Sequence, residues 1–306
     1  MSLKPVPLVS VVLPFRNPGK DLLNSVQSIL WQSFTDWELI LLDDGSTDPA
    51  TQCLKGIRDE RIRLIPHRKS AGLPTMLNEG IRLAQGRYLA RMDADDVAFP
   101  ERLERQVGYL ERNRSVDLLA TAALVIDRSN VPLGLMAAGL SHREICQKPY
   151  HGFPMPHPTW MGRTDWFRKH GYAKSAVRCE DQVLLLQSFH TSCLAGLSEA
   201  LLGYRFHGIS PKNTIRGRYH YLCALAKERR WQWLMQGFLV HMLAAGRDLV
   251  AFQGRWDRRA IKWKTTPLNP ESVKEWNKIL TRLEDKNAPA ETNCNLEASR
   301  SGLGQR

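Results

Sequence analysis

Residues 87–96 read Arg-Tyr-Leu-Ala-Arg-Met-Asp-Ala-Asp-Asp, an apolar segment followed at once by three carboxylates. The composition of Arg87 to Met92 predicts a buried β-strand, and the acidic run begins where that strand ends. A second such segment, Glu38 to Leu42, ends in Asp43-Asp44-Gly45. Ligands of parallel α/β sheets bind beyond the carboxyl ends of the strands, so the two acidic strand ends indicate where a ligand site forms.

Helical periodicity alternates with these strands through the first half of the chain. Apolar residues at intervals of three and four predict helices, and continuous apolar runs predict further strands. Strands separated by helices indicate a mostly parallel, doubly wound α/β sheet. The other predicted elements are strands at Leu8 to Leu13, Arg61 to Ile65 and Leu118 to Ile126, and helices at Leu22 to Leu30, Asn78 to Gln85 (capped by Gly86), after Pro100 and from near Glu180.

Composition narrows the classes of partner. The chain has 306 residues, with 43 Lys and Arg against 31 Asp and Glu, a formal charge of +12. This excess favours anionic partners: phosphates, nucleic acid or an anionic membrane face. Nucleic acid is the least favoured, because no recognition motif accompanies the charge. The six cysteines include no Cys-x-x-Cys pair, so we interpret them as reduced thiols rather than a zinc or redox site.

Two apolar segments bear on whether the protein spans or contacts a membrane. Val6 to Leu13 is too short to span a bilayer and lacks a cleavage site, so we interpret it as a strand and expect a cytoplasmic protein. Trp231 to Gly246 contains no charged residue and is flanked by Arg230 and Arg247. Such a helix either lies on an anionic membrane surface, at the inner face of the membrane, or packs on the rest of the protein.

The acidic run after the fourth strand predicts a metal site. Asp93, Asp95 and Asp96 fall within four residues, and their carboxylates repel one another unless a cation compensates them. Carboxylate oxygens suit Mg²⁺ or Mn²⁺, which also bind diphosphate oxygens. A charged surface turn is the alternative, and it is disfavoured because the run follows a buried strand.

Three other segments have both a structural and a functional interpretation. The run Asp43-Asp44-Gly45-Ser46-Thr47-Asp48 could bind a base or ribose, or cap a turn. Glu180-Asp181 opens an apolar helix, where a carboxylate could serve as a base or only cap the helix. In Tyr204-Arg205-Phe206-His207, Arg and His could neutralise a diphosphate or belong to an aromatic strand.

The order of these segments resembles glycosyltransferase family 2, a family of inverting enzymes with the GT-A fold of nucleotide-diphospho-sugar transferases. The resemblance covers about Val9 to Ser210, two-thirds of the chain. Besides the acidic clusters, it is carried by Val9 to Asn17, Ser28 to Phe34, Gly72-Leu73 with Asn78, Ala90 to Asp96, Pro100 with Arg102-Leu103 and Gln106, and His157-Pro158-Thr159.

The resemblance implies roles for individual residues. The nucleobase pocket would be lined by residues after the first strand, and the Asp-x-Asp element would hold the ribose or a divalent metal, Mg²⁺ or Mn²⁺. The Glu-Asp element would supply the general base. These roles fall on Pro14, Phe15, Arg16, Asn17, Asp44, Asn78 and Arg205 for the donor, on Asp93 for donor or metal, on Asp95 and His207 for the metal, and on Asp181 for the base.

The resemblance also implies a domain organisation and a substrate class. A catalytic domain would occupy residues 1–215, with a donor half at about 1–115 and an acceptor half at about 116–215. Beyond the resemblance, composition predicts a basic helical extension at 216–284 and, because they are polar and lack periodicity, a disordered tail at 285–306. The donor would be a UDP-, GDP- or dTDP-sugar, and the acceptor a saccharide or lipid-linked molecule in cell-surface polysaccharide or glycolipid synthesis.

Two departures from the family pattern leave alternatives open. Arg16 stands where an aromatic residue is common, although a guanidinium can still stack on a base. Gln187 stands where an arginine is usual, which concerns the acceptor side. A nucleotidyltransferase and a catalytically inactive nucleotide-sugar binding module are the competing functions. The first is disfavoured because Pro14 to Lys20 lacks a glycine-rich triphosphate loop, and the second because Asp95 and Asp181 are both present.

Overall fold

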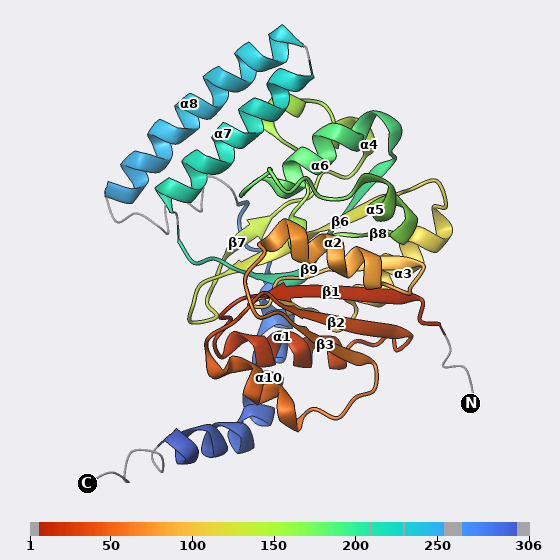
Figure 1. Ribbon diagram of the computed structural model, residues 1–306, viewed down its shortest axis with the longest axis vertical. Coiled ribbons are helices and arrows are strands. Elements are labelled where there is room, and N and C mark those ends of the chain that lie inside the picture. Colours follow the sequence, from red (N-terminus) through yellow and green to blue (C-terminus); the bar gives the residue numbers. More distant parts are fainter. Residues whose placement is uncertain (1–5, 209, 229, 254–264, 299–306) are drawn as a thin grey trace.

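The computed structural model describes residues 6–208, 210–228, 230–253 and 265–298. It is a layered α/β structure built on one nine-stranded sheet, with strand order β3-β2-β1-β4-β8-β6-β9-β5 and β7 paired with β6 (Figure 1). The strands are β1 (Val9–Phe15), β2 (Trp37–Asp43), β3 (Ile62–Pro66), β4 (Tyr88–Arg91), β5 (Val97–Ala98), β6 (Leu118–Ile126), β7 (Pro132–Met136), β8 (Met161–Arg163) and β9 (Leu194–Arg205).

Helices cover both faces of the sheet and extend beyond it. Short 3₁₀ turns connect several elements, among them η2 (Pro149–His151) and η3 (His157–Thr159). The α-helices are α1 (Asp21–Leu30), α2 (Leu73–Leu83), α3 (Arg102–Arg112), α4 (His142–Ile145), α5 (Thr164–His170), α6 (Glu180–Ser188), α7 (Pro211–Lys227), α8 (Trp231–Gln253) and α10 (Pro270–Ala298).

The first half of the sheet is parallel, as the alternation of strands and helices predicted. Strands β3, β2, β1 and β4 all run in the same direction. In the second half β6 and β9 are parallel, but β8, β7 and β5 pair antiparallel with their neighbours. The antiparallel strand β8 joins the two parallel groups, so the ends of β4 and β9 meet beside the acidic run.

Side chains that point alternately to the two faces of the sheet fill two hydrophobic cores. Val9, Val11 and Leu13 face one apolar cluster, whereas Val12 faces the other, because successive side chains of a strand point to opposite faces. Both faces of β1 are therefore buried, which explains why its sequence is a continuous apolar run.

One predicted boundary was wrong. Helix α2 spans Leu73–Leu83 rather than Asn78 to Gln85, and Gly86 does not cap it. A Cβ atom at Gly86 would lie 2.6 Å from the backbone nitrogen of Ser10. Gly86 is therefore needed where the chain passes close to β1 before entering β4.

The described helices of the C-terminal third lie in two separate places. Helices α7 and α8 lie together at one end of the molecule, whereas α10 lies at the opposite end (Figure 1). Helix α10 runs to Ala298 and so enters the segment 285–306, for which a disordered tail stays a prediction; residues 299–306 lie outside the described part. The basic segment 254–264, which was expected to be helical, also lies outside it.

Helix α10 packs on the sheet through a third apolar cluster. Trp276 is fully buried there, stacks on Phe99 at a centroid distance of 6.1 Å and donates a hydrogen bond to the Asn130 carbonyl. Ile279 and Leu283 belong to the same cluster. The apolar spacing of this segment therefore serves the core of the sheet rather than a separate extension.

We predict that Trp276→Ala destabilises the protein by about 3–5 kcal/mol, because it removes a large buried ring and leaves a cavity. Trp231→Ala is the matched control: its ring is 75% exposed, and its loss should change stability by less than about 0.5 kcal/mol. Denaturant unfolding of both variants measures the difference. Equal stability of the two would show that α10 is not part of the folded core.

Candidate active site

A buried arginine anchors the acidic loop after β4. Arg91 is the last residue of β4, and its two terminal nitrogens donate to the two carboxylate oxygens of Asp93 at 2.7 and 2.6 Å. Arg102 on α3 is also buried and donates to the Arg91 carbonyl at 2.7 Å. The fork of a guanidinium matches a carboxylate, so this pair fixes the direction of the Asp93 side chain.

Three carboxylates converge beyond Arg91. One oxygen from each of Asp93, Asp95 and Asp96 can be chosen so that all lie within 4.8 Å of one another. Asp96 is fully buried: its Oδ1 accepts from the Arg205 backbone at 2.9 Å, and its Oδ2 has no hydrogen-bond partner. Burial, then the charges of Asp95 and Asp93, raise the pKa of Asp96 well above its usual value. A cation at this cluster would relieve that repulsion.

His207 lies beside this cluster, at the position where the sequence predicted a metal ligand. Its Nε2 is 2.6 Å from Asp95 Oδ2, and both side chains are partly exposed. An imidazole and a carboxylate that meet at the edge of an acidic cluster form a donor set that a divalent cation can use.

Arg205 has a different role from the predicted diphosphate contact. Its side chain is buried, with Nε donating to the Asp95 carbonyl at 2.9 Å and Nη1 donating to Asn130 Oδ1 at 2.9 Å. These contacts hold the backbone of the acidic loop against the end of β9.

The loops after β1 and β2 are tied together. Asn17 has a positive φ of 50°, and its Oδ1 accepts from the Thr47 backbone at 2.7 Å. The ring of Phe15 packs in the core, Pro14 is buried, and Arg16 is exposed at the start of the loop. Of the predicted nucleobase residues, Arg16 and Asn17 are therefore the ones at the surface.

Asp44 organises a third loop at the same edge of the sheet. Its carboxylate accepts from Ser70 Oγ at 2.7 Å, from the Ala71 backbone at 2.6 Å and from the Gly72 backbone at 3.1 Å. Both oxygens are thereby engaged in shaping the entry to α2. The sequence suggested a base contact for this residue and did not indicate the loop as its partner.

Asn78 fastens α2 to the segment after α5 rather than facing the acidic loop. Its side chain donates to the Tyr172 carbonyl at 2.8 Å and accepts from the Tyr172 backbone nitrogen at 2.8 Å. The Tyr172 hydroxyl in turn lies 2.8 Å from Nε2 of the buried His157. Asn78 thus positions the wall of the site.

The predicted base and the acidic loop open into one cavity. A cavity of about 510 Å³ is lined by Arg91, Asp93, Glu180 and Asp181, among others; we call it the reaction cavity. Gln182 donates to Asp181 Oδ2 at 2.9 Å. Burial raises the pKa of Asp181, and the hydrogen bonds from Gln182 oppose that rise. Asp93 and Asp181, which are far apart in sequence, therefore face a shared space.

Glu180 is the more perturbed of the two helix-opening carboxylates. Burial, followed by the charge of Asp181, raises the pKa of Glu180 to about 7. The preceding Arg178 has a positive φ of 67°, an uncommon conformation for a residue with a side chain. A Cβ atom on Gly217 of α7 would lie 2.7 Å from the Arg178 carbonyl, so only glycine lets α7 approach this strained residue.

Sequence reasoning missed several residues that build the site. Arg91 and Arg102 were noted only as parts of the resemblance, and Arg178 and Gln182 were given no role. A signal was available for Arg91, because an arginine inside an apolar strand needs a buried partner. No comparable signal marks Arg178, since its importance comes from its backbone conformation.

Known proteins are similar to this chain over the part that contains the β1, β2 and β4 loops of the site. The family model for glycosyl transferase family 2 matches residues 10–171. EpsE of Bacillus subtilis strain 168, named as a glycosyltransferase, is 36% identical over 206 residues, covering 65% of this chain and 73% of EpsE. An uncharacterized glycosyltransferase of Haemophilus influenzae strain Rd is 31% identical over 214 residues, 66% of each protein.

Solved structures share the fold. S. aureus TarS 1–349 in complex with UDP-GlcNAc superposes with a TM-score of 0.61 at 18% identity, covering 89% of this chain and 79% of that one. The complex of the same protein with UDP gives a TM-score of 0.57 at 19% identity, covering 71% and 64%.

We predict that Glu180→Gln changes how stability depends on pH. In the folded protein the pKa of Glu180 is raised from its usual value of 4.5 to about 7. The protonated side chain therefore contributes fully to the stability of the folded state below pH 4.5, and this contribution is lost as the pH rises to 7. The variant lacks that loss, so its free energy of unfolding relative to wild type should increase by up to about 3 kcal/mol over this window.

Chemical denaturation across this pH window, with a chelator present, measures the effect. Glu101→Gln, which alters an exposed glutamate on the surface, is the control. Parallel pH curves for Glu180→Gln and wild type would contradict the buried, protonated state of Glu180.

Proposed function

Since the chain belongs to glycosyltransferase family 2, a family of enzymes with the GT-A fold, we propose that it transfers a sugar from a nucleoside-diphosphate donor to an acceptor hydroxyl. We propose further that the reaction inverts the anomeric configuration. The observation that carries this proposal is the reaction cavity, in which Asp93 of the acidic loop and Asp181 of α6 line one space. A donor at the acidic loop would have its anomeric carbon between the two.

The loops after β1 and β2 are the proposed nucleoside site. Arg16 is exposed there, and its guanidinium can stack on a base; Asn17 holds the two loops together. Asp44 would act on the base through the Ser70 to Gly72 loop that it organises. The TarS structures with UDP and UDP-GlcNAc support a nucleotide sugar as the donor. The proposed donor of this chain is a UDP-, GDP- or dTDP-sugar.

The acidic cluster fits a divalent cation. It offers three carboxylates in close range, one buried oxygen of Asp96 without a partner, and the imidazole of His207. Asp93, Asp95 and His207 would hold Mg²⁺ or Mn²⁺, and the nitrogen ligand favours Mn²⁺. When bound there, such an ion would neutralise the charge that develops on the departing diphosphate.

The chain's own residues account for the other steps. Arg91 fixes Asp93 at the edge of the cavity, and Arg205 holds the loop that carries Asp95. Asp181 removes the proton from the acceptor hydroxyl as the acceptor oxygen attacks the anomeric carbon from the face opposite the diphosphate. Gln182 orients the Asp181 carboxylate for that transfer. A single displacement of this kind inverts the configuration.

We predict that Asp181→Asn keeps donor binding but lowers turnover by at least about 100-fold, the scale of general-base catalysis. Asp165→Asn, which removes an exposed carboxylate of α5, should keep wild-type turnover. Release of nucleoside diphosphate from a panel of nucleotide sugars with Mn²⁺ and a saccharide acceptor measures both.

Three other outcomes of this measurement would contradict the proposal. Near-normal turnover in folded Asp181→Asn would contradict its role as the base. Release of inorganic diphosphate would indicate nucleotidyl transfer, and no turnover with any donor would indicate a binding module.

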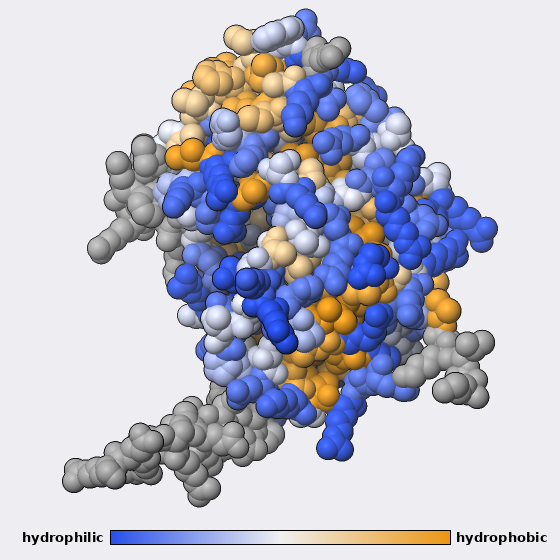
Figure 2. Space-filling view, in the orientation of Figure 1, coloured by the Kyte–Doolittle hydropathy of each residue, from blue (hydrophilic) through white to orange (hydrophobic). Residues whose placement is uncertain are grey.

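Helix α8 supports a second part of the proposal, contact with an anionic membrane surface. Its inner side packs on the core through Trp233 and Leu234, together with Tyr221 and Leu225 of α7. Its outer side is exposed, and hydrophobic side chains gather over this end of the molecule in Figure 2. The exposed residues are Trp231, Met235, Phe238, Leu239, Met242 and Leu243, which recur at helical spacing.

Charge around this face favours a lipid surface as the occupant. Residues 211–247 include seven Lys and Arg and one acidic residue, Glu228. An apolar face with a basic surround fits an anionic lipid surface. Among the described residues, no helix is long and apolar enough to cross a membrane. This placement would suit a lipid-linked acceptor in cell-surface polysaccharide or glycolipid synthesis.

We predict that the protein sediments with vesicles containing anionic lipid and that the double change Leu239→Glu with Leu243→Glu abolishes this. Both side chains are more than 60% exposed, at 61% and 69%, so the melting temperature should not fall. Val131→Glu, at an exposed site in the β6–β7 turn, is the control. High salt should weaken binding, because exposed charges are screened beyond about 8 Å at physiological ionic strength. If the intact protein ignores anionic vesicles at low salt, the membrane proposal is wrong.

A further inference from the structure

The mechanism above makes no use of Tyr204, a side chain of the reaction cavity. Tyr204 lies near the end of β9 and lines the cavity together with Asp93 and Asp181. Its ring packs against the apolar core that contains Leu13, so the position of the side chain is fixed. Within the described part of the chain, no residue forms a hydrogen bond with the Tyr204 hydroxyl. The hydroxyl is therefore left for a ligand.

The strand end that carries Tyr204 is held against the acidic loop. The backbone nitrogen of Arg205 donates to Asp96 Oδ1 at 2.9 Å, and Arg205 Nε donates to the Asp95 carbonyl at 2.9 Å. Three residues after Tyr204, the imidazole of His207 lies 2.6 Å from Asp95 Oδ2. Because these contacts join β9 to the loop, Tyr204 is positioned beside the carboxylates before a ligand binds.

The hydroxyl of Tyr204 lies within electrostatic range of all three carboxylates. Burial, then the charges of Asp96, Asp93 and Asp95, raise the pKa of Tyr204 above its usual value of 10. A phenol is already neutral at pH 7, and its ionisation here would add a negative charge to an acidic cluster. The hydroxyl therefore serves as a hydrogen-bond donor rather than as a base or a metal ligand.

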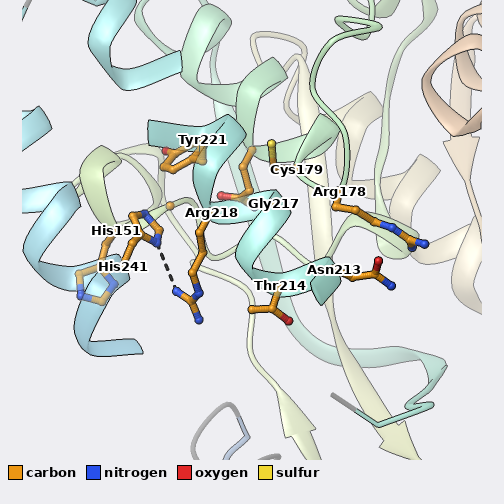
Figure 3. Close-up of a pocket in the computed structure, with 11 residues that line it drawn as sticks. His151, Arg178, Cys179, Asn213, Thr214, Gly217, Arg218, Tyr221 and His241 are labelled. Atoms are coloured by element: carbon orange, nitrogen blue, oxygen red, sulfur yellow. Dashed lines mark hydrogen bonds between the residues drawn. The ribbon is translucent and has the colours of Figure 1, made fainter. Parts of the chain in front are cut away.

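Four other described side chains that line the reaction cavity carry N–H donors, but these are engaged or point elsewhere. The terminal nitrogens of Arg91 and the amide of Gln182 donate to carboxylates, and Nε2 of His157 is bonded to a tyrosine hydroxyl. Arg178 also lines a neighbouring cavity of about 340 Å³, where its guanidinium extends toward Asn213 of α7 (Figure 3). Tyr204 thus offers an unused donor on the side of the acidic cluster.

We propose that Tyr204 is a further catalytic residue, whose hydroxyl donates a hydrogen bond to an oxygen of the donor β-phosphate, the phosphate that carries the sugar. This inference rests on the proposed transferase function. A donor with its anomeric carbon between Asp93 and Asp181 would have its β-phosphate at the acidic cluster, beside Tyr204. The diphosphate contact that the sequence suggested for Arg205 would then be made by the residue before it.

This hydrogen bond would strengthen during the reaction. The bond between the acceptor oxygen and the anomeric carbon forms while the bond between that carbon and the β-phosphate oxygen breaks, and the electron pair of the broken bond stays on the diphosphate. The acceptor proton passes to Asp181, and Tyr204 keeps its own proton. A fixed donor beside an oxygen that gains charge stabilises the transition state more than the ground state.

Nucleotide binding to the intact protein tests this contact without turnover. Tyr204→Phe removes only the hydroxyl, and the retained ring should keep the melting temperature unchanged. Calorimetric titration with Mn²⁺ uses whichever of UDP, GDP and dTDP binds wild type most tightly, and the monophosphate of the same nucleoside. The variant should bind the diphosphate at least about 10-fold more weakly, the loss expected for a hydrogen bond to a charged group, and should bind the monophosphate as wild type does.

Tyr109→Phe is the matched control. Tyr109 of α3 packs against the same apolar core but lies outside the reaction cavity, so its change should leave both affinities unchanged. Titration of Mn²⁺ alone is a second readout, and Tyr204→Phe should bind the ion as wild type does, because every carboxylate is retained. Weaker Mn²⁺ binding by Tyr204→Phe would show that the hydroxyl acts through the acidic loop, and it would overturn the proposal.

Turnover completes the test. With the nucleotide sugar that wild type uses, kcat should fall about 10- to 100-fold in Tyr204→Phe and stay at the wild-type value in Tyr109→Phe. Unchanged turnover, or equal weakening of monophosphate and diphosphate binding, would contradict a contact with the β-phosphate.

The same titrations separate this inference from the proposed function. If wild type binds none of the three nucleoside diphosphates, the proposed function fails and the role of Tyr204 fails with it. If wild type binds one of them and Tyr204→Phe binds it equally tightly, the role of Tyr204 alone fails.

Discussion

The bidentate ion pair between Arg91 and Asp93 is the interaction on which the rest of the site depends. Three carboxylates within four residues repel one another, and burial makes their ionised forms more costly. Arg91 supplies a buried positive charge at the end of β4, and Arg102 holds the carbonyl of Arg91 in place. On the far side, the backbone and side chain of Arg205 hold Asp96 and the carbonyl of Asp95. The acidic loop is thus fixed before any cation binds.

A consequence is that the site is assembled from parts that are distant in sequence. The acidic loop follows β4, the proposed base opens α6, and His207 follows β9. Helix α7 completes the arrangement, because Gly217 lets it pack against the strained backbone of Arg178 just before Glu180 and Asp181. The described helices of the C-terminal third are therefore part of the fold: α7 supports the start of α6, and α10 fills the core at the other end of the sheet.

Local patterns explain what could be predicted from the sequence. The parallel strands, the acidic strand ends and the start of α6 follow from periodicity and from residue type, which depend on neighbouring residues. The roles of Asp44, Asn78 and Arg205 do not, because their hydrogen-bond partners are 26, 94 and up to 110 residues away. The docking of α10 is equally remote, since Trp276 bonds to a carbonyl 146 residues earlier. Such contacts exist only once the sheet has formed.

We propose that the acidic loop and the donor diphosphate share a divalent cation. The most direct measurement is calorimetric titration of UDP, GDP and dTDP into wild type and Asp95→Asn, with Mn²⁺ and with a chelator. If the cation is shared, at least one nucleotide should bind wild type more tightly with Mn²⁺, and Asp95→Asn should lose this difference while remaining folded. Unchanged Mn²⁺-dependent binding by Asp95→Asn would contradict a shared cation.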